Sequence, residues 1–375
     1  MAAVQNFNEP IPIKGAPAIK APVFKGHTVR QIVHISVGGA GLRVKLSNLF
    51  GQGPITLSEV RVARSTGAGN TDVSTDRAVT FGNQTTVTMA AATETWSDPI
   101  SFDAVANADL AVSFYVPEDA PLGVHHLFAT QTAYVGTGNT VSAASLSAAE
   151  TWWSHYWLAG IDVSSPETTK VVVAFGDSIT DGFGSTLDAS HRWPNYLDGR
   201  LQLDTSIGRT SVVNAGIGGN RWLHDGFGPN GSGRFERDVL RVSGATHAIV
   251  LLGINDIALS QSIPSEAVSS EQITASMDAA TTKAKAAGVR VYLGTLLPFK
   301  GAGYYTEACE ATRQSVNTWI RTSAKADGVI DFDKVVQDPA DSLALLPAYD
   351  SGDHLHPNDA GYQSMANAVD LNLLR

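Results

Sequence analysis

The pattern of apolar residues changes near Lys170, and this change constrains the fold more than any other feature of the chain. Before it, short runs alternate apolar with polar residues, as in LRVKLS at 42–47. After it, continuous apolar runs such as VVVAF at 171–175 and HAIVLLGI at 247–254 alternate with stretches of helical period. Alternation is typical of strands with one solvated face, whereas continuous runs are typical of strands buried on both faces. The sequence therefore predicts two domains of different fold class.

The first domain is expected to be all-β. Runs of strand character follow one another from about 28 to 135, and Gly, Asn, Asp and Pro separate them. This spacing predicts a β-sandwich of two packed sheets over 28–150, preceded by an N-terminal extension at 1–27. A Ser/Ala/Thr-rich stretch at 137–151 and an aromatic cluster then indicate a linker at 151–168.

The second domain, 169–375, is expected to be a doubly wound α/β domain. Its buried strands alternate with amphipathic helical stretches, which predicts a parallel sheet with helices on both faces. In such a sheet the ligand site forms at the carboxyl ends of the strands. The residues that follow VVVAF, SVVNAGI and HAIVLLGI should therefore converge.

Composition limits the classes of partner. Apolar residues make up 43% of the 375 residues and charged residues 17%, as in a globular protein, and the formal net charge is −10. This charge would repel nucleic acid and anionic membranes, so a neutral small-molecule or saccharide substrate is expected. No run of about 18 apolar residues occurs, and 1–24 lacks a signal-peptide core, so we expect a soluble chain. A signal peptide cleaved earlier is compatible with this sequence, and the compartment and oligomeric state stay open.

The single cysteine, Cys309, excludes an intrachain disulfide and a cysteine-rich metal site. No positively charged residue adjoins it in the sequence, so we expect a small buried residue on a helix rather than a reactive thiol.

Three strand ends carry candidate functional residues. Ser178 lies in GDSIT, where the first apolar strand meets the start of a helix, and backbone N–H groups there would stabilise negative charge beside its hydroxyl. The second strand ends in NAGIGGN at 214–220, whose glycines allow backbone N–H groups to approach a ligand. The third ends in GIND at 253–256, which places the Asn255 carboxamide at the same edge. Each segment, taken singly, is also compatible with an ordinary turn or helix cap.

The segment DHLHP at 353–357 offers a base with its own orienting group. A carboxylate three residues before an imidazole on one turn accepts the Nδ1–H hydrogen bond, so Asp353 would leave Nε2 of His356 free to deprotonate a hydroxyl. The alternative is a metal site, because Asp350, Asp353, His354 and His356 are all potential ligands within seven residues. A serine mechanism needs no metal, and we expect neither metal nor cofactor.

In order and position, these four blocks resemble those of the SGNH hydrolases, also called the GDSL family, over about 170–375. The resemblance implies a flavodoxin-like sheet of order 2-1-3-4-5. It also implies Ser178 as nucleophile, His356 and Asp353 as the rest of a triad, and an oxyanion hole formed by the N–H groups of Ser178 and Gly219 with the Asn255 side chain. The choice of Gly219 rather than Gly218 rests on counting from Asn214.

The segment at 27–51 resembles the β-sandwich that precedes the catalytic domain in one bacterial branch of these enzymes, described as carboxylesterases or arylesterases. Some of that branch act on acetylated saccharides. The resemblance therefore implies a serine esterase for short-chain carboxylic esters, either aryl or acetyl. The alternatives are a lysophospholipase or thioesterase that uses the same residues, a metal-dependent hydrolase, or a carbohydrate-binding protein without activity.

Two groups of aromatic residues are candidate substrate contacts. Trp193, Trp222 and Phe227 lie near the motif segments and are candidate walls of the substrate pocket, with ordinary packing as the alternative. The aromatic residues at the predicted linker either stack on a sugar ring or pack between the domains, and these are Trp152, Trp153, Tyr156 and Trp157.

Overall fold

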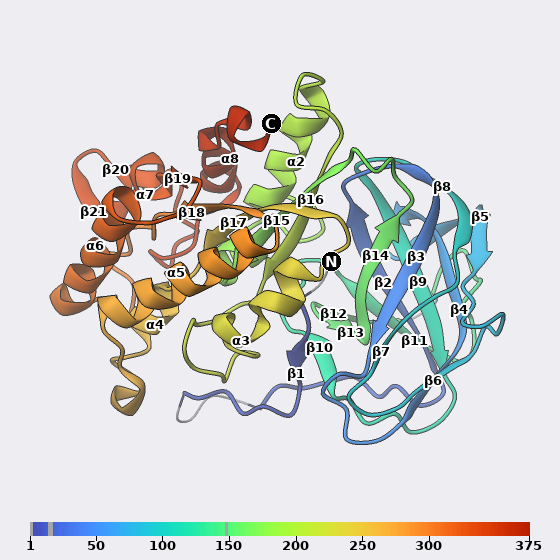
Figure 1. The fold of residues 1–375 in the computed structure, drawn as a ribbon. Helices are drawn as coiled ribbons and strands as arrows, with labels where there is room; N and C mark the ends of the chain where they lie inside the picture. The colour runs from blue at the N-terminus through green and yellow to red at the C-terminus, as the bar shows by residue number, and fades with distance from the viewer. Residues whose placement is uncertain (1–2, 14–17, 147–148) are drawn as a thin grey trace. The chain divides into compact units, whose positions relative to one another are not determined.

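The computed structural model describes residues 3–13, 18–146 and 149–375 (Figure 1). These residues form two compact units. The first comprises 3–9 and 18–166, and the second comprises 10–13 and 167–375.

The first unit is built from antiparallel sheets and confirms the predicted β-sandwich. Its largest sheet has the order β12-β11-β2-β9-β4-β5, with β6 paired to β4. These strands are β2 (His27–Ile35), β4 (Ile55–Gly67), β5 (Asn70–Ala78), β6 (Val87–Met89), β9 (Ala108–Val116), β11 (Ala133–Thr137) and β12 (Glu150–Trp152). The second sheet consists of β3 (Gly39–Ser47), β7 (Glu94–Trp96), β8 (Ile100–Ala104) and β14 (Leu158–Val163). A small third sheet contains β1 (Gln5–Asn6), β10 (Val124–His126) and β13 (His155–Tyr156).

Alternation along β3 shows why the first unit forms a sandwich. Leu42, Val44 and Leu46 are at most 2% exposed, whereas Arg43 and Lys45 between them are half-buried. Successive side chains of a strand point to opposite faces, so the apolar set lies in the core.

The structure differs from the sequence prediction at 1–27 and 151–168. Within the first range β1 pairs with β10, and Phe24 is buried against Tyr156 and Trp157. The second range, predicted as a linker, contains the whole of β13 and of β14. Tyr156 and Trp157 are 1% and 0% exposed in the first unit's core, so burial of these large aromatic residues turns the predicted linker into sheet.

The second unit is the doubly wound α/β domain that the sequence predicts. Its parallel sheet has the order β16-β15-β17-β18-β19, which is 2-1-3-4-5 counted along the domain. The strands are β15 (Lys170–Gly176), β16 (Thr210–Gly216), β17 (Ala245–Leu251), β18 (Arg290–Gly294) and β19 (Gly328–Ile330). β15 is an inner strand: β16 pairs with one of its edges, and β17, β18 and β19 follow in order from the other edge. Right-handed crossovers in opposite directions place helices on opposite faces of the sheet.

Long helices cover both faces of this sheet (Figure 1). α2 (Trp193–Leu203) packs against α8 (Asp359–Ala368), and α5 (Ser270–Ala286) packs against α6 (Glu307–Thr322). The short elements are α1 (Ser178–Asp181), α3 (Gly231–Phe235), η1 (Glu236–Leu240), α4 (Ile254–Ala258), η2 (Pro264–Glu266), α7 (Phe332–Val336), η3 (Leu371–Leu374) and the hairpin β20 (Gln337–Asp338) to β21 (Asp341–Leu345). Within the described ranges, no helix has the length and apolar character needed to cross a membrane.

Side-chain caps fix where the long helices α5, α6 and α8 begin. Ser269 and Gln272 form a capping box at α5, Thr306 accepts the Cys309 N–H at α6, and Asn358 accepts the Gly361 N–H at α8. Each cap satisfies a backbone donor that the first helical turn leaves without a partner. Cys309 itself is buried on α6, as predicted.

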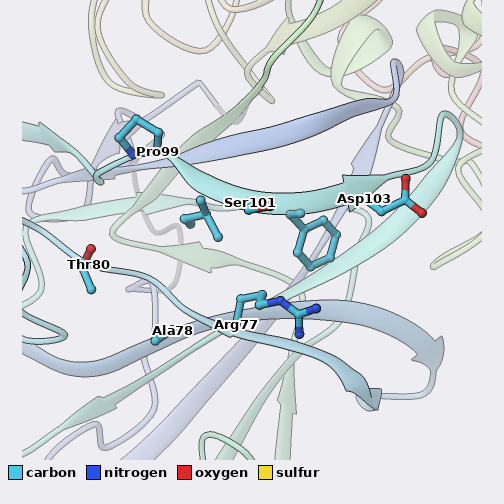
Figure 2. A pocket seen from close by; sticks show the side chains of 8 residues that line it. Arg77, Ala78, Thr80, Pro99, Ser101 and Asp103 are labelled. Atoms are coloured by element: carbon cyan, nitrogen blue, oxygen red, sulfur yellow. The ribbon is translucent and has the colours of Figure 1, made fainter.

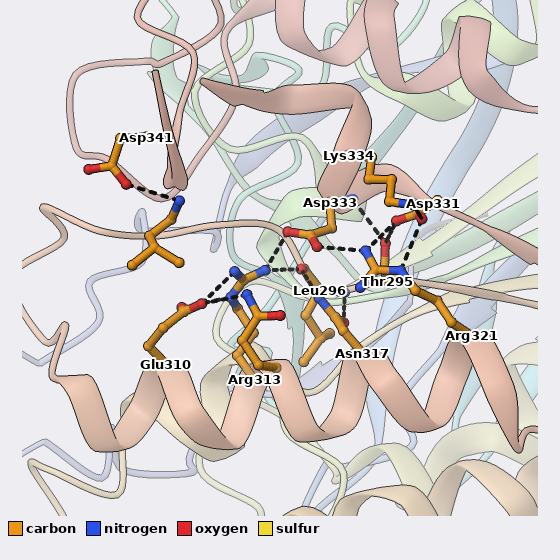
Figure 3. A network of polar contacts seen from close by, with 12 residues as sticks. Thr295, Leu296, Glu310, Arg313, Asn317, Arg321, Asp331, Asp333, Lys334 and Asp341 are labelled. Atoms are coloured by element: carbon orange, nitrogen blue, oxygen red, sulfur yellow. Dashed lines mark hydrogen bonds and ion pairs between the residues drawn. The ribbon is translucent and has the colours of Figure 1, made fainter. Parts of the chain in front are cut away.

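A buried network of charges holds the segment that leaves β18 (Figure 3). Arg313 on α6, with a fully buried side chain, pairs with Glu310 at 2.7 Å and Asp333 at 2.5 Å. It also donates to the Leu296 carbonyl, and Asn317 bonds both the N–H and the carbonyl of Leu296. Because every partner is satisfied, the network fixes α6 and α7 relative to the end of β18.

Candidate active site

Ser178 is placed at the end of β15 by a tight turn. Asp177 caps α1 by accepting the Ile179 N–H at 3.0 Å. A Cβ on Gly176 would lie 2.4 Å from the Leu251 carbonyl oxygen, so only glycine fits there. Burial raises the pKa of Asp177 to about 7, against the effect of the Ile179 hydrogen bond.

The structure brings together the three residues predicted as a triad. The Ser178 Oγ lies 2.7 Å from Nε2 of His356, and Nδ1 of the same ring lies 2.5 Å from Oδ2 of Asp353. A carboxylate only accepts hydrogen bonds, so Nδ1 carries the proton and Nε2 is left to accept the Ser178 hydroxyl. These three side chains come from two ends of the domain, separated by 178 positions between Ser178 and His356.

Asp353 is held in its ionised form. Burial acts to raise the pKa of this carboxyl, but the hydrogen bond and charge of His356 and the N–H groups of His356 and Leu355 outweigh burial. The pKa of Asp353 therefore lies well below its usual value. The ionised carboxylate is the form that orients and stabilises a protonated imidazole.

The four residues of the alternative metal site form two separate Asp–His pairs. His354 Nδ1 lies 2.6 Å from Oδ2 of Asp350, and His356 is paired with Asp353. Among the described residues, no group of three or more His, Cys, Asp or Glu side chains is arranged to hold a metal ion. The geometry thus places each imidazole with its own carboxylate.

Three N–H donors of the predicted oxyanion hole are available for a ligand. Within the described part of the chain, the backbone N–H groups of Ser178 and Gly219 donate no hydrogen bond. Asn255 uses one Nδ2–H on the Asn220 carbonyl at 3.1 Å, which leaves its second hydrogen. The N–H of Gly218, in contrast, donates to Asp181 at 3.1 Å, which favours Gly219 as the donor.

Asn220 is a residue that the sequence analysis did not single out, although it connects the donor groups. Its carbonyl accepts from Asn255, and its Nδ2 donates to the Phe227 and Pro229 carbonyls. Its Oδ1 accepts from the fully buried Arg234 at 2.9 Å. Asn220 directly follows Gly219 in the sequence, and this position could have identified it as a site residue.

Arg234 and Asp256 support the same region, although neither was predicted as a site residue from the sequence. Arg234 donates to the carbonyls of Gly176 and Ala215, and so joins the ends of β15 and β16. Asp256 accepts the Trp222 N–H at 2.8 Å beside Asn255, and burial raises the pKa of this carboxyl to about 7. No pattern in the sequence links Arg234 to these strand ends.

The three candidate pocket residues separate into two kinds. Trp193 and Trp222 are 0% exposed, and they pack against Phe332 and Phe175 respectively. Neither presents a surface to a ligand, because both indoles fill the core between the sheet and its helices. Phe227 is half-buried, and a Cβ on Gly219 would lie 2.5 Å from its Cγ. Its ring therefore lies directly against Gly219.

A cleft of about 520 Å³ is present in the first unit, away from these residues in the sequence (Figure 2). It is lined by Arg77, Ala78 and Thr80 on one side and by residues 99–103 on the other. None of the site residues predicted from the sequence lines it. Trp153, one of the candidate sugar-stacking residues, is 62% exposed in the same unit and does not line this cleft either.

Two solved structures illustrate what this chain is similar to at low sequence identity. A GDSL-like lipase from Bacteroides thetaiotaomicron is 23% identical, with a TM-score of 0.42, and the match covers 56% of this chain and 91% of that one. An acetylxylan esterase from Geobacillus stearothermophilus, Axe2, is also 23% identical, with a TM-score of 0.42 and coverage of 54% and 92%. A search of curated proteins returned no match.

The family model of the GDSL-like lipases and acylhydrolases matches residues 174–364, slightly more than half of the 375 residues. The matched segment begins in β15, before Ser178, and ends in α8, after His356. This chain belongs to the GDSL-like lipase/acylhydrolase family.

Proposed function

We propose that this protein is a serine esterase that hydrolyses short-chain carboxylic esters through an acyl-enzyme. The observation that carries the proposal is the continuous hydrogen-bonded chain from Ser178 Oγ through His356 to Asp353, at 2.7 and 2.5 Å. A nucleophile in hydrogen-bond reach of a base, which is itself oriented by a third group, is the arrangement required for covalent catalysis.

In acylation, Nε2 of His356 takes the Ser178 proton as Oγ forms a bond to the ester carbonyl carbon. The N–H groups of Ser178 and Gly219 and the Asn255 side chain would stabilise the negative oxygen of the tetrahedral intermediate. The bond to the alcohol then breaks, and the imidazolium gives its proton to the leaving oxygen. Asp353 compensates the charge of the imidazolium throughout.

Deacylation repeats these steps with water. His356 removes a proton from the water as its oxygen attacks the acyl-enzyme, and the bond to Ser178 Oγ breaks as that proton returns to the serine. The products are the free acid and a regenerated hydroxyl. Slow deacylation would appear as a burst of alcohol ahead of steady turnover.

The proposed substrates are neutral acetyl or aryl esters, including acetylated saccharides. The net charge of −10 disfavours anionic substrates, and the preference for short acyl groups follows from the branch that the sequence resembles. The choice between a small-ester hydrolase and a lipid hydrolase is a matter of acyl-chain length, which kinetics measures directly.

The test is hydrolysis of nitrophenyl acetate, butyrate and octanoate by the wild type and Ser178→Ala, each with and without EDTA. We expect rapid cleavage of the acetate that resists the chelator and is abolished in Ser178→Ala. An equally active Ser178→Ala protein would refute the serine mechanism, and a preference for octanoate would indicate a lipid hydrolase.

A further inference from the structure

The tetrapeptide Asp-Gly-Phe-Gly occurs twice in the second unit, at 181–184 and 225–228. In both copies the glycines on either side of the phenylalanine have positive φ, 105° and 89° in the first copy and 123° and 83° in the second. Residues with a side chain rarely adopt such angles, so both turns depend on glycine. The two copies thus form similar turns, each of which presents one phenylalanine.

Each phenylalanine contacts a different member of the proposed catalytic group. The ring of Phe183 lies 4.6 Å from the ring of His356, and Phe183 is 39% exposed. The half-buried ring of Phe227 lies against Gly219, where an added Cβ would be 2.5 Å from its Cγ. One aromatic surface therefore lies beside the base and the other beside an oxyanion donor.

The backbone of each turn is fixed by a hydrogen bond to its phenylalanine carbonyl. The Phe183 carbonyl accepts a 2.6 Å hydrogen bond from Tyr362, which is fully buried on α8. The Phe227 carbonyl accepts from Asn220, at 3.3 Å, and Asn220 also accepts from Asn255. The two rings are therefore held in place and are not surface residues with free backbones.

We infer that Phe183 and Phe227 determine substrate specificity separately, Phe183 for the alcohol and Phe227 for the acyl group. This inference rests on the proposed esterase function. Of the four substituents of the tetrahedral carbon, Ser178 Oγ and the oxyanion are placed by the nucleophile and the hole. The leaving alcohol must approach His356, which gives it a proton, and so passes beside Phe183. The acyl group takes the remaining direction, and we assign it to Phe227, the second aromatic ring of the site, which lies beside the oxyanion donor Gly219.

The test uses two substrate series in which one half of the ester stays constant. Benzyl and ethyl acetate vary the alcohol, and nitrophenyl acetate, butyrate and hexanoate vary the acyl group. For Phe183→Ala, kcat/KM for benzyl acetate relative to ethyl acetate should fall about twofold to tenfold, the factor that one aromatic contact contributes. The acyl-chain profile of this variant should match the wild type.

Phe227→Ala should show the opposite behaviour. Removal of the ring opens space on the acyl side, so kcat/KM for the hexanoate relative to the acetate should rise about twofold to tenfold, with the benzyl-to-ethyl ratio unchanged. Leu203→Ala, at a side chain 86% exposed at the end of α2, is the control and should leave both ratios unchanged. Thermal unfolding and stoichiometric labelling of Ser178 by a fluorophosphonate would show that each variant is folded.

If each folded variant changes both ratios equally, or neither ratio, the inference is wrong. This outcome differs from failure of the proposed function, in which Ser178→Ala hydrolyses esters as fast as the wild type. An inactive Ser178→Ala protein combined with unchanged ratios would overturn only the assignment of the two phenylalanines.

Discussion

Asp353 contacts His356 twice: Oδ2 lies 2.5 Å from the ring Nδ1, and Oδ1 accepts the backbone N–H of the same residue at 2.8 Å. A third hydrogen bond, from the Leu355 N–H, also ends on Oδ1. One carboxylate therefore fixes both the backbone and the ring of His356. This local arrangement orients Nε2 toward Ser178.

Replacement of Asp353 by asparagine should lower kcat about 10²- to 10⁴-fold. An amide that donates to Nδ1 favours the tautomer whose Nε2 carries a proton and cannot accept one from Ser178. The lower end of this range is a smaller loss of kcat than is typical of triads with a buried carboxylate. The reason is that the Asp353 side chain is 42% exposed, so water replaces part of its function. His354→Asn, which removes the imidazole of the second Asp–His pair and tolerates its positive φ of 62°, is the control and should keep kcat within about threefold. If Asp353→Asn and His354→Asn lowered kcat by the same factor, the assignment of His356 as the base would be wrong.

Replacement of Asn255 by alanine should lower kcat about 100- to 1,000-fold with little change in KM. The lost donor acts on the oxyanion, which exists only in the transition state and the intermediate. Steady-state kinetics with nitrophenyl acetate measures this effect, and thermal unfolding reports the cost of losing the bond to Asn220. Unchanged turnover in a folded variant would remove Asn255 from the proposed mechanism.

Replacement of Gly219 by alanine should reduce both stability and activity. Its φ of 75° is strained for any residue with a side chain, and the new Cβ would collide with Phe227. We expect a loss of more than about 1 kcal/mol in the free energy of unfolding, measured by urea denaturation. Gly199→Ala is the matched control: a Cβ there, in the interior of α2, meets nothing within 4 Å and should stabilise the protein by about 0.5–1 kcal/mol. If Gly219→Ala and Gly199→Ala changed the free energy of unfolding equally, backbone strain and the collision with Phe227 would not explain the loss at Gly219.

Asp198 should make the protein less stable as pH rises. Burial raises the pKa of this carboxyl to about 7 from an unfolded value near 3.8, although Gln202 donates to it. Between these values the folded state binds more protons than the unfolded state, so its contribution to stability falls from pH 4 to pH 7 and is constant above. Across this window the loss reaches up to about 4 kcal/mol, at 1.36 kcal/mol per pH unit.

Asp198→Asn should remove this dependence, because its side chain is neutral at every pH. Urea denaturation at pH 5 and pH 8 is the measurement: the variant should gain clearly more stability over the wild type at pH 8 than at pH 5. A gain of the same size at both values would mean that titration of Asp198 is not responsible.

Replacement of Arg313 by methionine should cost about 3–5 kcal/mol of stability. The change removes the Arg313 charge from the buried carboxylate of Glu310 and leaves Asp333 paired with Arg321, and breaking a buried ion pair in this way is strongly destabilising. Arg321→Met, in the same network but 24% exposed, should cost less because water reaches its guanidinium and its partner Asp331, although Arg321 also pairs with the buried Asp333. Chemical denaturation of the two variants compares them. A larger loss for Arg321→Met would show that burial does not control the energetics of this network.

The sequence by itself determined the class of both domains and predicted Ser178, Asp353 and His356 as a group. Period-two alternation along β3 and continuous apolar runs in β15 and β17 reflect how many faces of each strand are buried, and burial is encoded locally. GDSIT, GIND and DHLHP mark strand ends and a pre-helical turn, so their approach follows from the topology of a parallel sheet. The sheet order and the second unit's fold class agree with this prediction.

Tertiary structure alone decided what surrounds those residues. Trp193 and Trp222 are near the motifs in the sequence but buried in the core, whereas Phe183, which was not a candidate, lies beside His356. Aromatic character does not reveal whether a side chain faces the core or a ligand, because both environments are apolar. The predicted linker became strand for the same reason: burial of Trp157 depends on Phe24 and Phe114, which are distant in the chain.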